Sequence, residues 1–213
     1  MKNSKHIIGG LVVALIGLVI LFTPLPSEAN HDIMESAGDP ERIMVRVYTI
    51  EMKTAIQDVG EAQVMKGAMK FVQDLIECAS FWGVATEVMK QAADAGQIPR
   101  EMVAIVQHSG QVTANQLNLY AVALQEHRGI EKFNASSFIH SAEKIGNNLV
   151  PSISEELMGP NAQQYLAQRV SVCMPIHTVY VDSMAQIQKG LSQGLTPEQI
   201  VPEPEATEKD TGA

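Results

Sequence analysis

The chain has 213 residues, a formal net charge of -9 and a sequence pI near 5.1. It is 46% hydrophobic and 18% charged, which excludes a chain that is disordered throughout and suits a single domain. The excess of acidic groups also argues against nucleic-acid binding, because no basic stripe is available to displace counterions from phosphates.

The N-terminus has the layout of an export signal. Two lysines precede an uncharged apolar run, residues 7–22, and two prolines follow it. A small-residue pattern ending at Ala29 predicts cleavage before Asn30. The length of the run also suits an uncleaved membrane anchor, so residues 1–29 are either a signal peptide or an anchor. Both interpretations predict a periplasmic or secreted protein, free or held at the inner membrane by its N-terminal segment.

The exported part begins with a short linker and a helix. Residues 30–38 are polar and end in glycine, which is typical of a linker. Asp39, Pro40 and Glu41 provide an N-cap, a first-turn proline and a first-turn acid. The β-branched side chains of residues 43–50 also suit a strand, but the cap favours a helix.

Apolar residues then recur at steps of three and four, which is helical spacing. This pattern predicts three helices, at about residues 60–95, 99–128 and 134–149. Pro151 is expected to end the third helix, and a capping-box pattern at residues 152–155 predicts a separate single turn. A last helix is expected from Asn161 to about residue 194. Long amphipathic segments with short connections favour an all-α, up-and-down bundle of about four helices, occupying residues 39–195.

The chain ends in an acidic segment, residues 196–213. It contains three prolines, five acidic residues and one lysine. Such a segment cannot bury enough apolar surface to offset the entropy lost on ordering. We therefore expect a disordered tail.

The two cysteines lie near the middle of two predicted helices, on or beside apolar faces. In an oxidising compartment, thiols placed in this way are expected to pair. The sequence therefore predicts a disulfide between Cys78 and Cys173. Two inert buried thiols are the alternative, and the absence of a Cys-x-x-Cys motif argues against redox chemistry.

A metal site is a second interpretation of the same region. Cys173 and His177 are four residues apart on one helical face, and Met174 adds a thioether, so the three could bind a soft metal. No further histidine has a matching spacing, and the motifs for covalent haem and for a di-iron bundle are absent. We expect no cofactor, and the three residues stay an alternative.

Catalytic motifs are also absent from the sequence. It contains no nucleophile elbow, zinc-protease motif, phosphate-binding loop or dinucleotide fingerprint. These observations predict a non-enzymatic, exported helical protein that acts by protein–protein contacts, as an accessory or structural subunit, with a protein partner or by self-association. Membrane contact is expected only through residues 7–22, if they are uncleaved. The alternative is a periplasmic carrier that holds a ligand, metal or haem in the bundle interior.

Overall fold

A computed structural model describes residues 39–129 and 131–203 of the chain. Its six helices are α3 (Asp39–Val59), α4 (Glu61–Asp94), α5 (Arg100–Arg128), α6 (Ala135–Met158), α7 (Ala162–Ser192) and α8 (Pro197–Ile200). The described residues contain no strand, so the all-α prediction is confirmed for them, and residues 43–50 belong to α3. None of the described helices is long and apolar enough to cross a membrane. The predicted signal or anchor, its cleavage site at Ala29 and Asn30, and the linker lie outside the described residues.

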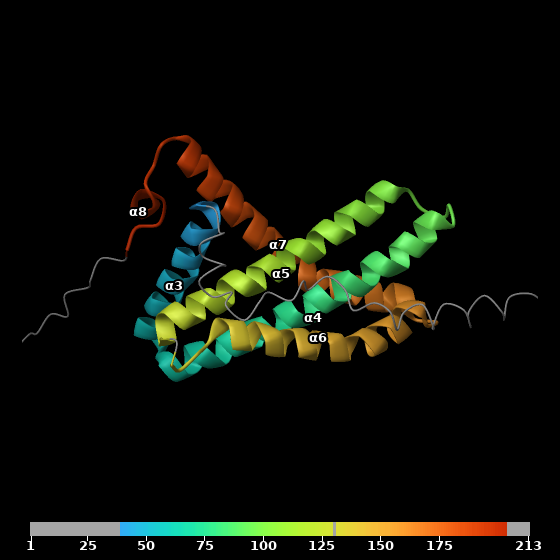
Figure 1. Cartoon of the computed structure of the whole chain (residues 1–213), viewed down its shortest axis with the longest axis horizontal. Coiled ribbons are helices and arrows are strands. Elements are labelled where there is room, and N and C mark those ends of the chain that lie inside the picture. The colour runs from blue at the N-terminus through green and yellow to red at the C-terminus, as the bar shows by residue number, and fades with distance from the viewer. Residues whose placement is uncertain (1–38, 130, 204–213) are drawn as a thin grey trace, which may run out of the picture.

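The helices form a bundle with one crossing helix. α4 and α5 make a long antiparallel hairpin, and α6 lies along α4 (Figure 1). α3 crosses α5 near one end of the hairpin, and α7 runs from the other end back toward α3 and α8. The described part therefore has five long helices instead of about four. Gly60, with φ 86°, turns the chain between α3 and α4, so the predicted segments before and after it count as two helices.

Pro151 does not end α6, contrary to the prediction from sequence. The helix continues past it, and the proposed separate turn at residues 152–155 is the last part of α6. Proline removes one helical N–H, and near it the hydroxyls of Ser152 and Ser154 donate to main-chain carbonyls at 2.9 and 2.8 Å. Ile153 is buried in the core. This burial stabilises the residues after the proline in the helical conformation.

The prediction of a disordered tail is wrong for residues 196–203, which we call the C-terminal segment. Its first residues form α8, whose N-terminus has a capping box. The Thr196 N–H donates to Gln199 Oε1 at 2.9 Å, and the Gln199 N–H donates to Thr196 Oγ1 at 3.4 Å. Ile200 lies on Gly190 of α7, where an added Cβ would come within 2.8 Å of Ile200 Cγ1. The segment is thus anchored by apolar packing: Ile200 fills a site that only glycine leaves open, and Val201 also packs against the core.

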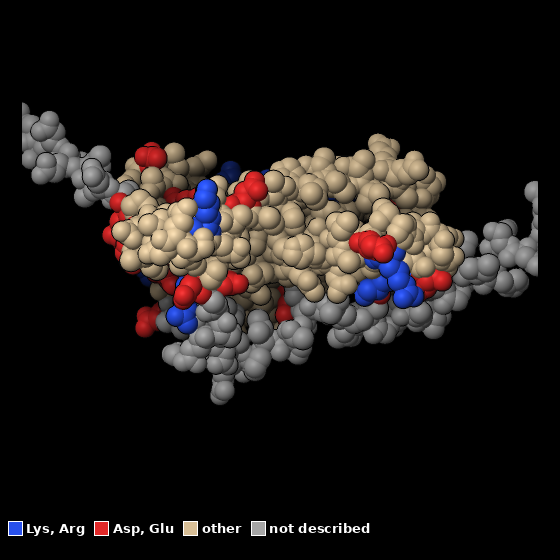
Figure 2. All heavy atoms as spheres, turned by 90° about the horizontal axis from the view of Figure 1, so that it is seen from above, with Lys and Arg blue, Asp and Glu red and all other residues tan. Residues whose placement is uncertain are grey.

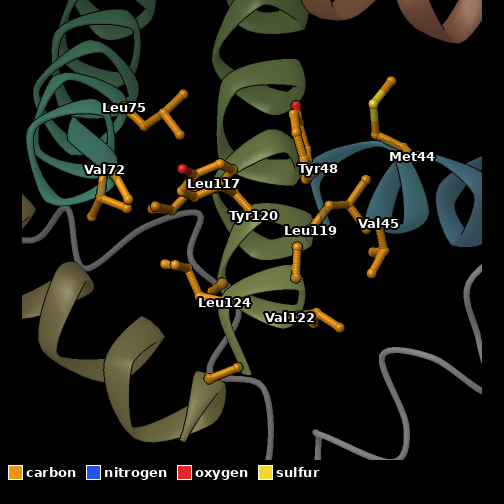
Figure 3. Packing of buried hydrophobic residues seen from close by; sticks show 14 of the residues in the cluster. Met44, Val45, Tyr48, Val72, Leu75, Leu117, Leu119, Tyr120, Val122 and Leu124 are labelled. Atoms are coloured by element: carbon orange, nitrogen blue, oxygen red, sulfur yellow. The ribbon is translucent and has the colours of Figure 1, made fainter. Parts of the chain in front are cut away.

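The core consists of two adjoining apolar clusters. In the larger one, Met44, Val45 and Tyr48 of α3 face the apolar side chains of α5, as Figure 3 shows. The smaller cluster surrounds the two cysteines and contains Cys78, Phe81, Trp82, Val84, Ala85, Ile153 and Cys173. Only four of the 31 residues of α7 are fully buried, but half-buried side chains such as Tyr165, Ile176 and Met184 pack against the two clusters. The other side of this helix is exposed to solvent.

Candidate interaction site

A disulfide joins Cys78 of α4 to Cys173 of α7, with the two Cα atoms 5.5 Å apart. This is the pairing that the sequence predicts. Both residues are buried between their helices and lie within the smaller apolar cluster. An intramolecular disulfide of this kind suggests a compartment other than the reducing cytoplasm.

The proposed metal ligands are not assembled into a site. The sulfur of Cys173 belongs to the disulfide, so it is not a thiolate ligand in this form of the protein. Met174 is exposed, while the buried Nε2 of His177 has no hydrogen-bond partner among the described residues. Within residues 39–129 and 131–203, no three His, Cys, Asp or Glu side chains are grouped in a way that could hold a metal ion.

His177 instead lies beside a second imidazole. Its ring centroid is 6.4 Å from that of His108 on α5, in an edge-to-face arrangement. Burial, and to a smaller extent the neighbouring His108, lower the pKa of His177 below its ordinary value. The ring is therefore neutral at pH 7 and contributes to the contact between α5 and α7 without a charge.

A small cavity of about 190 Å³ lies beside the smaller cluster, lined by Glu77, Leu149, Ser152, Ile153, Glu156, Tyr165 and Arg169. Arg169 donates to Glu77 Oε2 at 2.9 Å and to Tyr165 Oη at 3.2 Å. Burial alone would raise the pKa of the Glu77 carboxyl, but hydrogen bonds from Arg169 and Gln73 lower it overall. Glu77 is thus an ionised partner of Arg169, which suits an ion pair between α4 and α7 better than a proton donor.

A larger cavity, of about 320 Å³, opens on α3. We call it the cationic cavity; its lining residues are Arg42, Arg46, Thr49, Ile50, Lys53, Glu126 and Glu203. Its three basic residues, Arg42, Arg46 and Lys53, follow one another at steps of four and seven, so they share one face of the helix. In a chain with a net charge of -9, this is a local gathering of positive charge.

The C-terminal segment covers part of the cationic cavity. The Arg46 Nε donates to the Val201 carbonyl oxygen at 3.2 Å. The same guanidinium lies 3.7 Å from the Glu198 carboxylate and 3.8 Å from the Glu203 carboxylate. All three acceptors belong to residues about 155 positions further along the chain, which is why the site cannot be found from local sequence patterns.

Tyrosines from three helices gather near the middle of the larger cluster. The rings of Tyr48 and Tyr120 meet edge to face, with centroids 5.1 Å apart, and Tyr180 Oη accepts a hydrogen bond from Asn115 at 2.9 Å. Burial raises the pKa of Tyr120 and of Tyr180 to about 12. The pKa of Tyr48 is raised further by the same cause.

These shifts predict a loss of stability in alkali. Unfolded tyrosines ionise near pH 10, whereas the buried ones stay protonated up to about pH 12. The contribution is therefore complete below pH 10 and is lost as the pH rises from 10 toward 12. We expect urea unfolding to give a constant free energy between pH 8 and 9 and a falling one at pH 10 and 11. In Tyr180→Phe the fall should be shallower, and an equally steep fall in that variant would contradict this assignment.

Large aliphatic side chains lie exposed on α7 and α5. Val172 and Val179, two helical turns apart on α7, are 44% and 66% exposed, and Ile105 of α5 is 67% exposed. α7 carries only three charged side chains in its 31 residues. Figure 2 shows the charged residues of that view gathered toward the two ends of the molecule, with a broad uncharged surface between them.

The described residues provide a buried disulfide, two neighbouring histidines, an ion pair between helices, a cationic cavity and exposed aliphatic side chains. No protein-family model, curated protein or solved structure matches this chain.

Proposed function

We propose that the chain is an exported, non-enzymatic helical protein that acts through protein–protein contacts as an accessory or structural subunit. It works in the periplasm or outside the cell, either free or held at the inner membrane by residues 7–22. The export signal in the sequence and the Cys78–Cys173 disulfide support the location.

The exposed face of α7 is the observation that supports protein–protein contacts. Val172 and Val179 project from it with about half of their surface or more in solvent. Single exposed aliphatic residues are common, but several on one weakly charged helix are typical of a surface that another protein covers. The helix is long, it has only four buried residues, and it is fixed to α4 by the disulfide. A rigid exposed helix of this composition suits binding to an apolar face of a second chain.

The test is a native mass measurement on complexes extracted gently from the host. Wild-type protein is compared with a Val172→Asp/Val179→Asp double variant and with Gln188→Asp, which adds charge at an exposed polar position on another side of the same helix. We expect a second chain, a partner or another copy, to accompany the wild type and the control. The double variant should retain it at least tenfold less, while circular dichroism shows an unchanged helix content.

Two results would contradict the proposal. One is a wild-type chain that is always alone, and the other is a double variant that keeps the second chain as well as the control does. Extra mass on a lone chain that leaves on denaturation would support the carrier alternative instead. The same spectra show whether the chain begins at Met1 or at Asn30, which separates an anchored form from a cleaved one.

A further inference from the structure

An acidic segment of the same chain, residues 196–203, already covers part of the cationic cavity. Residues 196–203 present a main-chain carbonyl and two carboxylates to the single guanidinium of Arg46. Glu203, which lines the cavity, belongs to this segment. The remaining wall has three basic side chains and one carboxylate, that of Glu126, to which the Thr49 hydroxyl donates at 3.2 Å. Without the segment, the wall is therefore positively charged.

The ionic contacts of the segment are loose. Its two carboxylates lie 3.7 and 3.8 Å from the guanidinium nitrogens, and the side chains of Glu198 and Glu203 are 66% and 73% exposed. Ion pairs this exposed contribute little to stability, because water screens both charges. The firm contact of the segment is the packing of Ile200 on Gly190. The packing of Ile200, with that of Val201 against the core, therefore keeps a weakly bound acidic peptide in place.

We propose that the cationic cavity is a binding site for an acidic peptide segment of a partner protein, and that residues 196–203 occupy it in cis until the partner replaces them. The proposal rests on the protein-contact function above and names a second surface and a class of partner. The chemistry of recognition is visible in the segment itself: Glu198 and Glu203 lie on either side of the aliphatic Ile200, and the Val201 carbonyl accepts from Arg46.

The cavity has room for more negative charge than its own segment brings. Lys53 also lines the cavity, seven residues or about two helical turns beyond Arg46 on α3. A partner peptide with an additional acidic residue would reach both cations. Such a peptide competes with a segment that is tethered to the same chain and so has a high effective concentration. The cis segment therefore raises the threshold for binding and favours partners with more carboxylates.

The test uses the purified, oxidised full chain and a fluorescent peptide with the sequence of residues 196–203. Ile200→Ser weakens the cis segment and leaves the cavity wall intact. We expect the peptide to bind this variant at least fivefold more tightly than wild type. Adding Arg46→Gln to Ile200→Ser should weaken binding at least fivefold, whereas adding Arg100→Gln, at the far end of the hairpin, should not. A peptide with both glutamates replaced by glutamine loses the two ion pairs but keeps the carbonyl contact, so it should bind Ile200→Ser more weakly than the original peptide does, and more tightly than the original peptide binds the Arg46→Gln form.

Several outcomes would overturn the proposal. These are absence of binding to Ile200→Ser, equal binding to it and to wild type, or no effect of Arg46→Gln. Displacement of the peptide by an equal concentration of inorganic phosphate would show a general anion site and would also overturn it. Because this experiment uses purified components and leaves the face of α7 unchanged, its failure is distinguishable from failure of the proposed function.

Discussion

Replacing Cys78 and Cys173 together with alanine is expected to lower the free energy of unfolding by about 4 kcal/mol. The disulfide closes a loop between residues 95 positions apart, so its loss gives the unfolded chain much more conformational freedom. Urea unfolding at neutral pH, followed by circular dichroism, measures the difference.

Reduction of the wild-type protein provides the matched control. Adding a reductant to the unfolding reaction should lower the wild-type value to that of the double variant and leave the variant unchanged. The two residues are almost fully buried. Alanine removes only the sulfur atom at each position, so the cavities that it leaves are small. A difference below about 1 kcal/mol between the oxidised wild type and the double variant would contradict the role assigned to the disulfide.

Phe81→Ala is expected to lower the free energy of unfolding by about 3 to 5 kcal/mol. Phe81 is 0% exposed, and its ring centroid lies 4.8 Å from that of Trp82 and 6.4 Å from that of Tyr165. Truncation removes an aromatic ring from a closed cluster and leaves a cavity between α4 and α7. The measurement is the same urea titration, carried out on the oxidised protein.

Met69→Ala is the control for that substitution, since Met69 lies on the same helix and is 53% exposed. Its effect should stay within about 0.5 kcal/mol, as is usual for surface positions. If Phe81→Ala cost less than about 1.5 kcal/mol, the smaller cluster could not be the tightly packed unit that the structure describes.

The helices and the disulfide were accessible from the sequence because their signals are local or nearly so. Apolar spacing of three and four marks a helical face wherever the helix packs. Two cysteines behind an export signal leave only one intramolecular pairing to consider. Even the uncertain residues 43–50 took the conformation that the cap at Asp39 favours.

The errors have a common physical cause, which is packing between residues far apart in the sequence. Pro151 is a helix breaker by itself, yet the buried Ile153 keeps the helix going. The segment after Thr196 has the composition of a disordered tail, yet Ile200 packs on Gly190. Composition describes the average cost of ordering a segment, whereas one well-placed aliphatic contact can offset it locally.

The candidate site was predictable only in part for the same reason. Arg42, Arg46 and Lys53 have the spacing of one helical face, which would have indicated a basic stripe once residues 43–50 were taken as helix. The acidic groups that meet this stripe come from the other end of the chain. The metal site proposed at Cys173 and His177 is not assembled, although its local spacing was suitable, because the sulfur is bound to Cys78.

The disulfide also determines how the molecule transmits force. When the two ends of the chain are pulled apart, tension passes from residue 78 to residue 173 through the sulfur atoms and bypasses everything between them. The oxidised chain can therefore stretch roughly 300 Å less than the reduced one, at about 3.3 Å for each of the 95 bypassed residues. The part of α4 after Cys78, all of α5 and α6, and the part of α7 before Cys173 carry no load. A force applied between α3 and the C-terminal segment would thus leave this part of the bundle without tension.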